Sequence, residues 1–199
     1  MDVPLTPEIL LTAYANGIFP MADDEGEVHW LTPDPRAILP LEDFTVSRSL
    51  RSLHRRRPFR ITVDRAFGEV IEACAARAEG TWISPEIVAA YCRLHEMGFA
   101  HSVETWQEDT LAGGLYGVSL GGAFFGESMF HRVSNASKIA LVALVERMRE
   151  RGFGLLDVQF MTEHLRQFGA LEIPRKAYEE RLAEAVQLRT AFVDSPGKA

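Results

Sequence analysis

Two polar side chains interrupt an apolar stretch in the C-terminal part of the sequence. Asp157 and Gln159 lie two residues apart in a strand predicted over 155–159, whose other members are leucine and valine. Side chains two apart leave the same face of a strand, so the carboxyl and amide groups point to one side. Burying an unpaired carboxylate is costly, so Asp157 needs a partner or a chemical role. The alternative is a carboxylate at a strand end that touches water.

Glu127 has similar surroundings, because it is the only acid in a strand predicted over 122–130. Two carboxylates and an amide among apolar strands favour a functional site. The six histidines follow no metal-ligand spacing, and the sequence contains no GxSxG elbow and no Walker loop. We therefore expect neither a metal nor a cofactor.

A strictly basic segment is the second feature with chemical potential. Residues 44–63 contain six arginines and no acid, although the whole chain has a net charge of −7. A helix predicted over 47–57 places Arg48, Arg51 and Arg55 on one face. A row of guanidinium groups without neighbouring acids suits a phosphate backbone. A solvated helix face that pairs with acids of the segment 1–43 fits the same pattern.

Length and composition limit the classes of protein to consider. The chain has 199 residues, 47% hydrophobic and 25% charged, which is typical of a globular protein with one good-sized domain, or with one domain and a small appendage. The net negative charge taken alone speaks against a nucleic-acid binder. Two cysteines give no disulfide framework, so we expect a cytoplasmic protein. No apolar run is long enough to span a membrane, and the N-terminus lacks signal-peptide features.

The elements that must position these residues follow from hydrophobic periodicity and capping signals. A helix begins at Pro7, with Thr6 as its cap, and residues 18–27 read as a turn-rich loop before an extended segment at His29. The rest of the chain predicts helices and strands in an α+β arrangement with a mixed sheet. The predicted helices are 47–57, 64–78, 84–97, 135–151, 162–168 and 175–188, and the strands are 59–63, 101–106, 110–119, 122–130, 155–159 and 170–173.

Two further patterns permit a structural and a functional reading. Leu141, Leu144 and Met148 share one face of the helix predicted over 135–151, which indicates packing against the sheet or a pocket for an apolar side chain. Trp82 precedes a helix start, where an indole either fills the core or stacks on a base.

At these residues the sequence resembles the bacterial leucyl/phenylalanyl-tRNA–protein transferase family. The matching stretches occur in the same order and extend over roughly residues 7–185. They are YANGIFP (14–20), PDPRA (33–37), SRSL (47–50), GTWI (80–83), HSVE (101–104), GGLYGV (113–118), GESMF (126–130), NASK (135–138) and FGA (168–170).

The resemblance implies a fold and a reaction. The fold is a small N-terminal α/β domain, residues 1–40, packed on a GNAT-like (acyl-CoA N-acyltransferase-like) mixed-sheet domain, residues 41–199. The reaction moves Leu, Phe or Met from aminoacyl-tRNA to the N-terminal Lys or Arg of an acceptor protein, which marks that protein for N-end-rule degradation. No cofactor, metal or membrane is implied.

The resemblance also implies roles for individual residues. Asp157 and Gln159 match the pair that handles the attacking amine, and Glu127 matches an active-site acid flanked by substrate-binding Gly126 and Ser128. The remaining substrate-binding positions are the aromatics Trp82 and Phe124 and the apolar wall of Leu115, Leu141, Leu144 and Met148. The tRNA-binding positions are Arg48, Arg51, Arg55, Arg56 and Arg57.

The sequence departs from the family pattern at several of its positions. Met21 replaces a frequent Trp, Val158 a Cys, and His131 a Ser. Leu144 and Met148 stand where some members have Phe, which changes the shape of the expected pocket.

An aminoacyl ester is already activated, so its aminolysis requires positioning and a neutral amine rather than a strong base. We hypothesise that Asp157 orients Gln159, whose side-chain oxygen accepts a hydrogen bond from the amine, while Glu127 adds negative potential. Two alternatives remain: an acyl-CoA-dependent N-acyltransferase of a small amine, and a non-enzymatic adaptor for N-terminal residues. The segment 132–137 contains no glycine for a pyrophosphate cradle, which counts against acyl-CoA.

Overall fold

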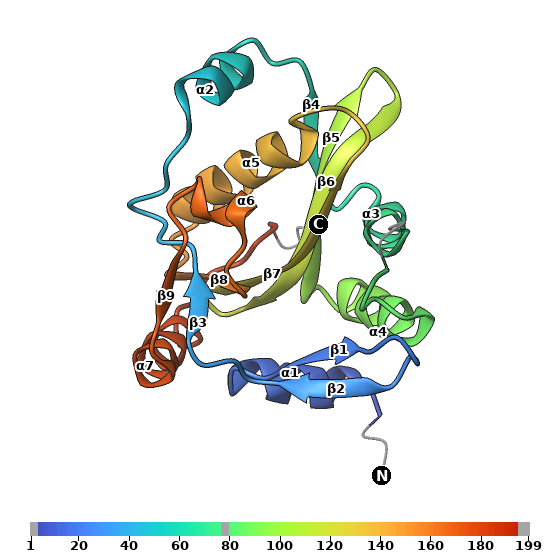
Figure 1. Cartoon of the computed structure of the whole chain (residues 1–199), viewed down its shortest axis with the longest axis vertical. Helices are drawn as coiled ribbons and strands as arrows, with labels where there is room; N and C mark the ends of the chain where they lie inside the picture. Colours follow the sequence, from blue (N-terminus) through green and yellow to red (C-terminus); the bar gives the residue numbers. More distant parts are fainter. Residues whose placement is uncertain (1–3, 77–79, 195–199) are drawn as a thin grey trace.

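The computed structural model describes residues 4–76 and 80–194, and its centre is a seven-stranded mixed sheet. All neighbouring strands pair antiparallel except β7 and β8, which are parallel. The α+β class with a mixed sheet is therefore confirmed. The strand order is β4 (Arg60–Val63), β5 (Ala100–Gln107), β6 (Thr110–Leu120), β7 (Ala123–His131), β8 (Leu155–Gln159), β3 (Arg36–Ile38) and β9 (Leu171–Ile173) (Figure 1).

Helices cover both faces of this sheet and define two hydrophobic cores. One core joins the sheet to α1 (Pro7–Ala15), α3 (Phe67–Ala75), α4 (Pro85–Glu96) and α7 (Arg175–Ala185). The other core lies under α5 (Ala136–Glu150) and receives residues of α2 (Arg48–Arg55) and α6 (Glu163–Arg166). The hairpin of β1 (Phe19–Ala22) and β2 (Val28–Leu31) lies next to α1 (Figure 1).

The predicted helices and strands from residue 47 onwards are present, and their ends differ by no more than three residues within the described part of the chain. Residues 77 and 78 of the helix predicted over 64–78 lie outside the described residues. The helix at Pro7 is confirmed, and Ile9 N donates to the side chain of Thr6. The prediction of a loop over 18–27 is wrong for residues 19–22, which form β1. Pro20 argues against a strand in the sequence, because proline has no N–H for strand pairing. However, β1 pairs with β2 alone, and a strand with one partner tolerates the missing N–H.

Strand β3 is absent from the elements predicted above, and it connects the N-terminal part of the chain to the main sheet. It follows two prolines and has three residues, one of them arginine, so it shows no alternation of apolar residues. It pairs with both β8 and β9. Residues before position 40 thus contribute a strand to the large sheet.

Arg36 on β3 is the most deeply buried cation of this connection, with 1% of its surface exposed. Its Nε and Nη2 donate to the carboxylate of Asp157 at 3.0 and 2.6 Å, and its Nη1 donates to Gly17 O at 3.0 Å. The rings of Phe19 and Tyr178 lie 4.7 and 4.6 Å from the guanidinium carbon. One side chain thereby joins β1, β3, β8 and α7.

We predict that Arg36→Met destabilises the protein by about 3–5 kcal/mol, because it leaves the carboxylate of Asp157 buried without its counter-charge. Urea unfolding measures this loss. The double variant Arg36→Met/Asp157→Leu should regain part of the loss, since it removes both charges of the pair. Arg175→Ala is the control, because its ion pair with Glu179 is exposed and should contribute less than about 0.5 kcal/mol. A loss below about 1 kcal/mol in Arg36→Met contradicts the assignment.

Candidate active site

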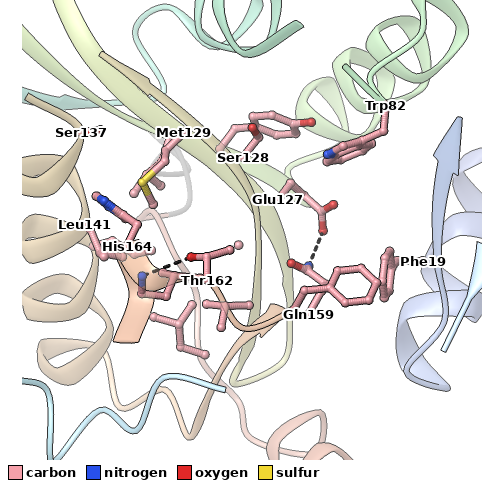
Figure 2. Close-up of a pocket in the computed structure, with 18 of the residues that line it drawn as sticks. Phe19, Trp82, Glu127, Ser128, Met129, Ser137, Leu141, Gln159, Thr162 and His164 are labelled. Atoms are coloured by element: carbon pink, nitrogen blue, oxygen red, sulfur yellow. Dashed lines mark hydrogen bonds between the residues drawn. The ribbon is translucent and has the colours of Figure 1, made fainter. Parts of the chain in front are cut away.

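A cavity of about 410 Å³ lies beside the point where strands β7 and β8 stop pairing. Parallel pairing runs from Ala123–Leu155 to Phe125–Asp157, and Glu127 and Gln159 follow the paired part. In Figure 2 these two side chains meet at one end of the cavity, while Met129, His164 and Leu141 gather at the other. The cavity therefore has a polar end with a carboxyl and an amide group.

A β-bulge aims Glu127 into this cavity. Tyr116 of β6 pairs with Ser128 and Gly117 pairs with Gly126, so Glu127 is an extra residue of β7 without a partner of its own. A bulge redirects a side chain and is frequent next to active sites. Gly117 permits the close approach, because a Cβ there would lie 2.2 Å from Phe125 O.

Gln159 is held in a left-handed backbone conformation at the end of β8, with φ of +59°. Such a conformation costs free energy for a residue other than glycine and persists only where the surroundings enforce it. Here the main-chain N–H of Gln159 donates to Asp157 Oδ1 at 2.9 Å, and Phe160 N donates to Val158 O at 2.7 Å. The side-chain Nε2 of Gln159 donates to Glu127 Oε1 at 3.3 Å.

Asp157 is fully buried and does not border on the cavity. Its carboxylate accepts hydrogen bonds from Arg36, from the Tyr178 hydroxyl at 2.6 Å and from the Gln159 main chain. The structure therefore gives this carboxylate a network of partners, and its contact with Gln159 runs through the main chain. Burial and the charge of Asp157 raise the pKa of Tyr178, which keeps that hydroxyl protonated.

The electrostatic environment of Glu127 differs from that of Asp157. Burial raises the pKa of Glu127 to about 8, and the negative charge of Asp157 adds to this effect. The hydrogen bond from Tyr14, the neighbouring hydroxyl of Tyr91 and the charge of Arg36 act in the opposite direction. Glu127 thus changes its protonation state close to neutral pH.

The wall of the cavity is largely apolar, and Leu115, Leu141 and Leu144, which the resemblance implies as substrate-binding residues, contribute to it. Phe124 and Met148 do not border on the cavity. Both are fully buried in the core under α5, where the ring of Phe124 lies 5.0 Å from that of Phe192. These two residues support the wall from behind.

Trp82, Gly126 and Ser128, which the resemblance also implies as substrate-binding residues, line the cavity as well. Most other lining residues carry no individual signal in the sequence: some are ordinary core residues and others lie in loops that follow a strand. Met21, His131 and Val158 stand out in the sequence only as departures from the family pattern. The lining residues not predicted are Phe19, Met21, Tyr116, Met129, His131, Ser137, Leu156, Val158, Phe160, Thr162, His164 and Leu165.

The arginines of the basic segment lie apart from the cavity. Arg48, Arg51, Arg55, Arg56 and Arg57 are all exposed. Within residues 4–76 and 80–194, none of them forms an ion pair, so pairing with the acids of the N-terminal segment is not observed there. Figure 1 shows α2 and the β1–β2 hairpin at opposite ends of the molecule.

The described residues contain one group of side chains close enough to share a metal ion, namely Asp23, Glu27 and His29 on the β1–β2 hairpin. All three are exposed, and Asp23 accepts a hydrogen bond from His29 at 2.8 Å. None of the three side chains lines the cavity. No helix in the described part of the chain is long and apolar enough to cross a membrane.

We predict that Glu127→Gln makes stability less dependent on pH. The pKa of Glu127 is about 8 in the folded protein, against an ordinary value of 4.5. Between these pH values only the folded state holds the proton, so stability falls as the pH rises through this window. From pH 5 to pH 8.5, the unfolding free energy of the variant relative to that of the parent should rise by about 2–4 kcal/mol, because each pH unit within the window contributes about 1.4 kcal/mol. Urea unfolding at both pH values measures this, and an equal difference at both contradicts it.

Comparison with known proteins identifies the family. The leucyl/phenylalanyl-tRNA protein transferase family matches residues 38–183, and its N-terminal domain matches residues 4–34. The leucyl/phenylalanyl-tRNA–protein transferase of Salinibacter ruber is 60% identical over 189 residues, which are 94% of this chain and 83% of the relative. The protein of that name from Rhodospirillum rubrum is 52% identical over 200 residues, 98% of this chain and 94% of the relative.

Similarity to solved structures is weaker. A ribosomal-protein-alanine N-acetyltransferase from Brucella melitensis is 17% identical and covers 71% of this chain and 98% of its own, with a TM-score of 0.40. The sequence matches favour the tRNA-dependent reaction over the acyl-CoA-dependent and adaptor alternatives. The chain therefore belongs to the leucyl/phenylalanyl-tRNA–protein transferase family and transfers an aminoacyl group from tRNA to proteins.

Proposed function

We propose that the protein transfers Leu, Phe or Met to the N-terminal Lys or Arg of acceptor proteins, and that the reaction takes place in the cavity beside Glu127 and Gln159. The observation that carries this proposal is a cavity with an apolar wall whose polar end presents an amide and a carboxyl group. An apolar wall suits the side chain of the donor, and convergent polar groups suit the reacting atoms.

The donor binds with its side chain against Leu115, Leu141 and Leu144. Apolar surface buried there favours Leu, Phe and Met over polar residues, because each buried methylene contributes roughly 0.8 kcal/mol. Phe124 and Met148 keep this wall in place from behind. The indole of Trp82 at the rim offers a flat surface for the terminal adenosine, and Gly126 and Ser128 flank the site where the ester lies.

The acceptor amine binds at the polar end of the cavity. The amide of Gln159 is held through its Nε2 by Glu127, which leaves its Oε1 free to accept a hydrogen bond from the amine. Asp157 acts on the main chain of Gln159 and fixes the position of this oxygen. In its ionised form, Glu127 adds a negative charge that favours a cationic N-terminal residue. The site then supplies orientation, which is what an activated ester requires.

The arginines of α2 bind the tRNA outside the cavity. Their exposure and their lack of acidic partners among the described residues leave the guanidinium groups available for phosphates. Such contacts depend on salt because each bound phosphate releases counterions. The cationic surface of α2 explains how a protein with a net negative charge binds RNA. The carboxyl group of Glu127 serves the acceptor instead.

A transfer assay tests the proposed reaction. Labelled leucyl-tRNA is incubated with a peptide that starts with Arg, and with the same peptide acetylated at its N-terminus as a control. We predict that Gln159→Ala lowers turnover at saturating substrates by about 10²-fold, because the amine is no longer positioned. Gln187→Ala, which changes an exposed glutamine, should retain parental turnover. Parental turnover in Gln159→Ala contradicts the proposal.

Salt dependence tests the tRNA surface. We predict that the triple variant Arg48→Ala/Arg51→Ala/Arg55→Ala binds tRNA more weakly and with a shallower salt slope, by roughly one unit of slope for each phosphate that an arginine no longer binds. Arg181→Ala is the matched control, because Arg181 is an exposed arginine on α7, away from α2 (Figure 1). Filter binding at several salt concentrations measures both slopes. An unchanged slope in the triple variant excludes α2 as the phosphate-binding surface.

A further inference from the structure

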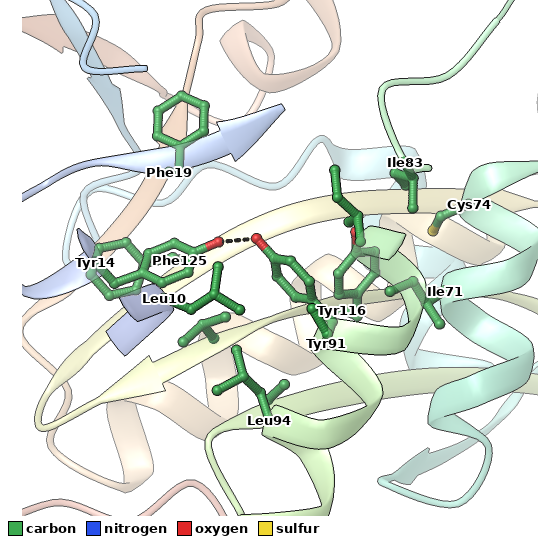
Figure 3. Close-up of a cluster of buried hydrophobic side chains, with 14 of the residues drawn as sticks. Leu10, Tyr14, Phe19, Ile71, Cys74, Ile83, Tyr91, Leu94, Tyr116 and Phe125 are labelled. Carbon is green, nitrogen blue, oxygen red and sulfur yellow. Dashed lines mark hydrogen bonds between the residues drawn. The ribbon is translucent and has the colours of Figure 1, made fainter. Parts of the chain in front are cut away.

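Two buried hydroxyl groups lie next to Glu127 without bordering on the cavity. Tyr14 of α1 and Tyr91 of α4 have no exposed surface, and their hydroxyl oxygens are in direct hydrogen-bond contact (Figure 3). The hydroxyl of Tyr14 also donates to Glu127 Oε1 at 2.8 Å. The chain Tyr91–Tyr14–Glu127 therefore connects the core to the polar end of the cavity.

The direction of these hydrogen bonds follows from the number of protons. A tyrosine hydroxyl has one proton, and Tyr14 gives its proton to the carboxylate of Glu127. Tyr91 must then donate to Tyr14. Both donors point towards Glu127, and they lie in an apolar cluster where the ring of Phe125 is 4.8 Å from that of Tyr14. A carboxylate in such surroundings is stabilised by donors that cannot turn to water.

Side chains from four elements around Glu127 affect its charge state. Tyr14 lies on α1, Tyr91 on α4, Asp157 on β8 and Arg36 on β3. The hydroxyl groups of the two tyrosines lower the pKa of Glu127 against the effect of burial, and the result is about 8. The α-amino group of a peptide has an ordinary pKa of about 7.7–8.0. Proton transfer between the two groups is thus close to balanced in free energy.

We propose that Glu127 takes a proton from the α-ammonium group of the acceptor, and that Tyr14 and Tyr91 are positioning residues that keep its carboxylate ready for this proton. This inference rests on the proposed function, because it assigns a step within that reaction. It gives Glu127 a catalytic role besides its negative potential. Through Tyr14, helix α1 of the N-terminal segment then contributes to catalysis.

The step balances as follows. The ammonium group gives one proton to Glu127 and becomes a neutral amine. Its lone pair forms the new C–N bond at the ester carbonyl carbon, and the C–O bond to the ribose oxygen breaks. The second proton lost by the nitrogen goes to that oxygen, which leaves as a hydroxyl group. Glu127 then releases its proton to water, so the products are an amide, a tRNA hydroxyl and one proton.

The first experiment is independent of transfer. Protein labelled with ¹³C at the glutamate carboxyl carbons is titrated by NMR, and the Glu127 signal is assigned by its loss in Glu127→Gln. Tyr14→Phe should raise the midpoint of Glu127 by about one pH unit, because it removes a hydrogen bond to the charged form. Tyr91→Phe should raise it less. Unchanged midpoints in both variants overturn the role of the tyrosines.

Tyr178→Phe is the matched control for this titration. It removes another buried tyrosine hydroxyl, but one that donates to Asp157 instead of Glu127. The midpoint of Glu127 should then stay within about 0.3 pH units of the parental value. A shift as large as that of Tyr14→Phe would mean that loosening of the core, and not the hydroxyl chain, moves the titration, which contradicts the proposal.

The second experiment is kinetic. With an Arg-peptide acceptor, Glu127→Gln should lose at least about tenfold in kcat/KM for the peptide at pH 6.5 and little at pH 9, where the amine is neutral without help. The KM for leucyl-tRNA should stay unchanged. A loss of equal size at both pH values overturns the proton transfer and leaves a structural role. If the parent transfers nothing, the proposed function fails, whereas the NMR titration still decides the role of the tyrosines.

Discussion

The buried ion pair between Arg36 and Asp157 is the interaction on which the rest of the site depends. Neither group reaches water, so each charge is tolerated only because the other lies within hydrogen-bond distance. The pair joins the short strand β3 to β8, and through Gly17 and Phe19 it fixes the N-terminal part of the chain. The carboxylate has oxygen sites left for Tyr178 and for the Gln159 main chain. A buried charge thus orders the backbone that carries the amide of the site.

Two irregularities of the sheet turn this framework into a site. The bulge in β7 aims Glu127 into the cavity, and the left-handed conformation at the end of β8 does the same for Gln159. A regular strand would leave Glu127 paired within the ladder, and a relaxed conformation of Gln159 would lose the hydrogen bond to Asp157. Local strain and the supporting network therefore belong together, as is common where a structure must hold reacting groups.

Much of this arrangement is predictable from the sequence, and the exceptions have physical reasons. The spacing of Asp157 and Gln159 and the isolated acid at 127 indicate a candidate site, because polar groups inside apolar strands need partners. The sequence does not show that Asp157 is paired with Arg36, since 121 positions separate them and β3 is too short for a recognisable period. The sequence also does not distinguish Leu144 from Met148, which follows it by one helical turn: Leu144 lines the cavity, whereas Met148 is buried in the core.

The central claim is that the aminoacyl group of the donor occupies the cavity with its carbonyl carbon beside Gln159 and Glu127. A crystal structure of the protein with a stable donor analogue, in which an amide replaces the ester between leucine and the 3′ carbon of adenosine, tests it most directly. We expect the leucyl side chain against Leu115, Leu141 and Leu144, and the carbonyl group within hydrogen-bond distance of the polar end. An empty cavity with the analogue bound elsewhere on the protein would contradict this account.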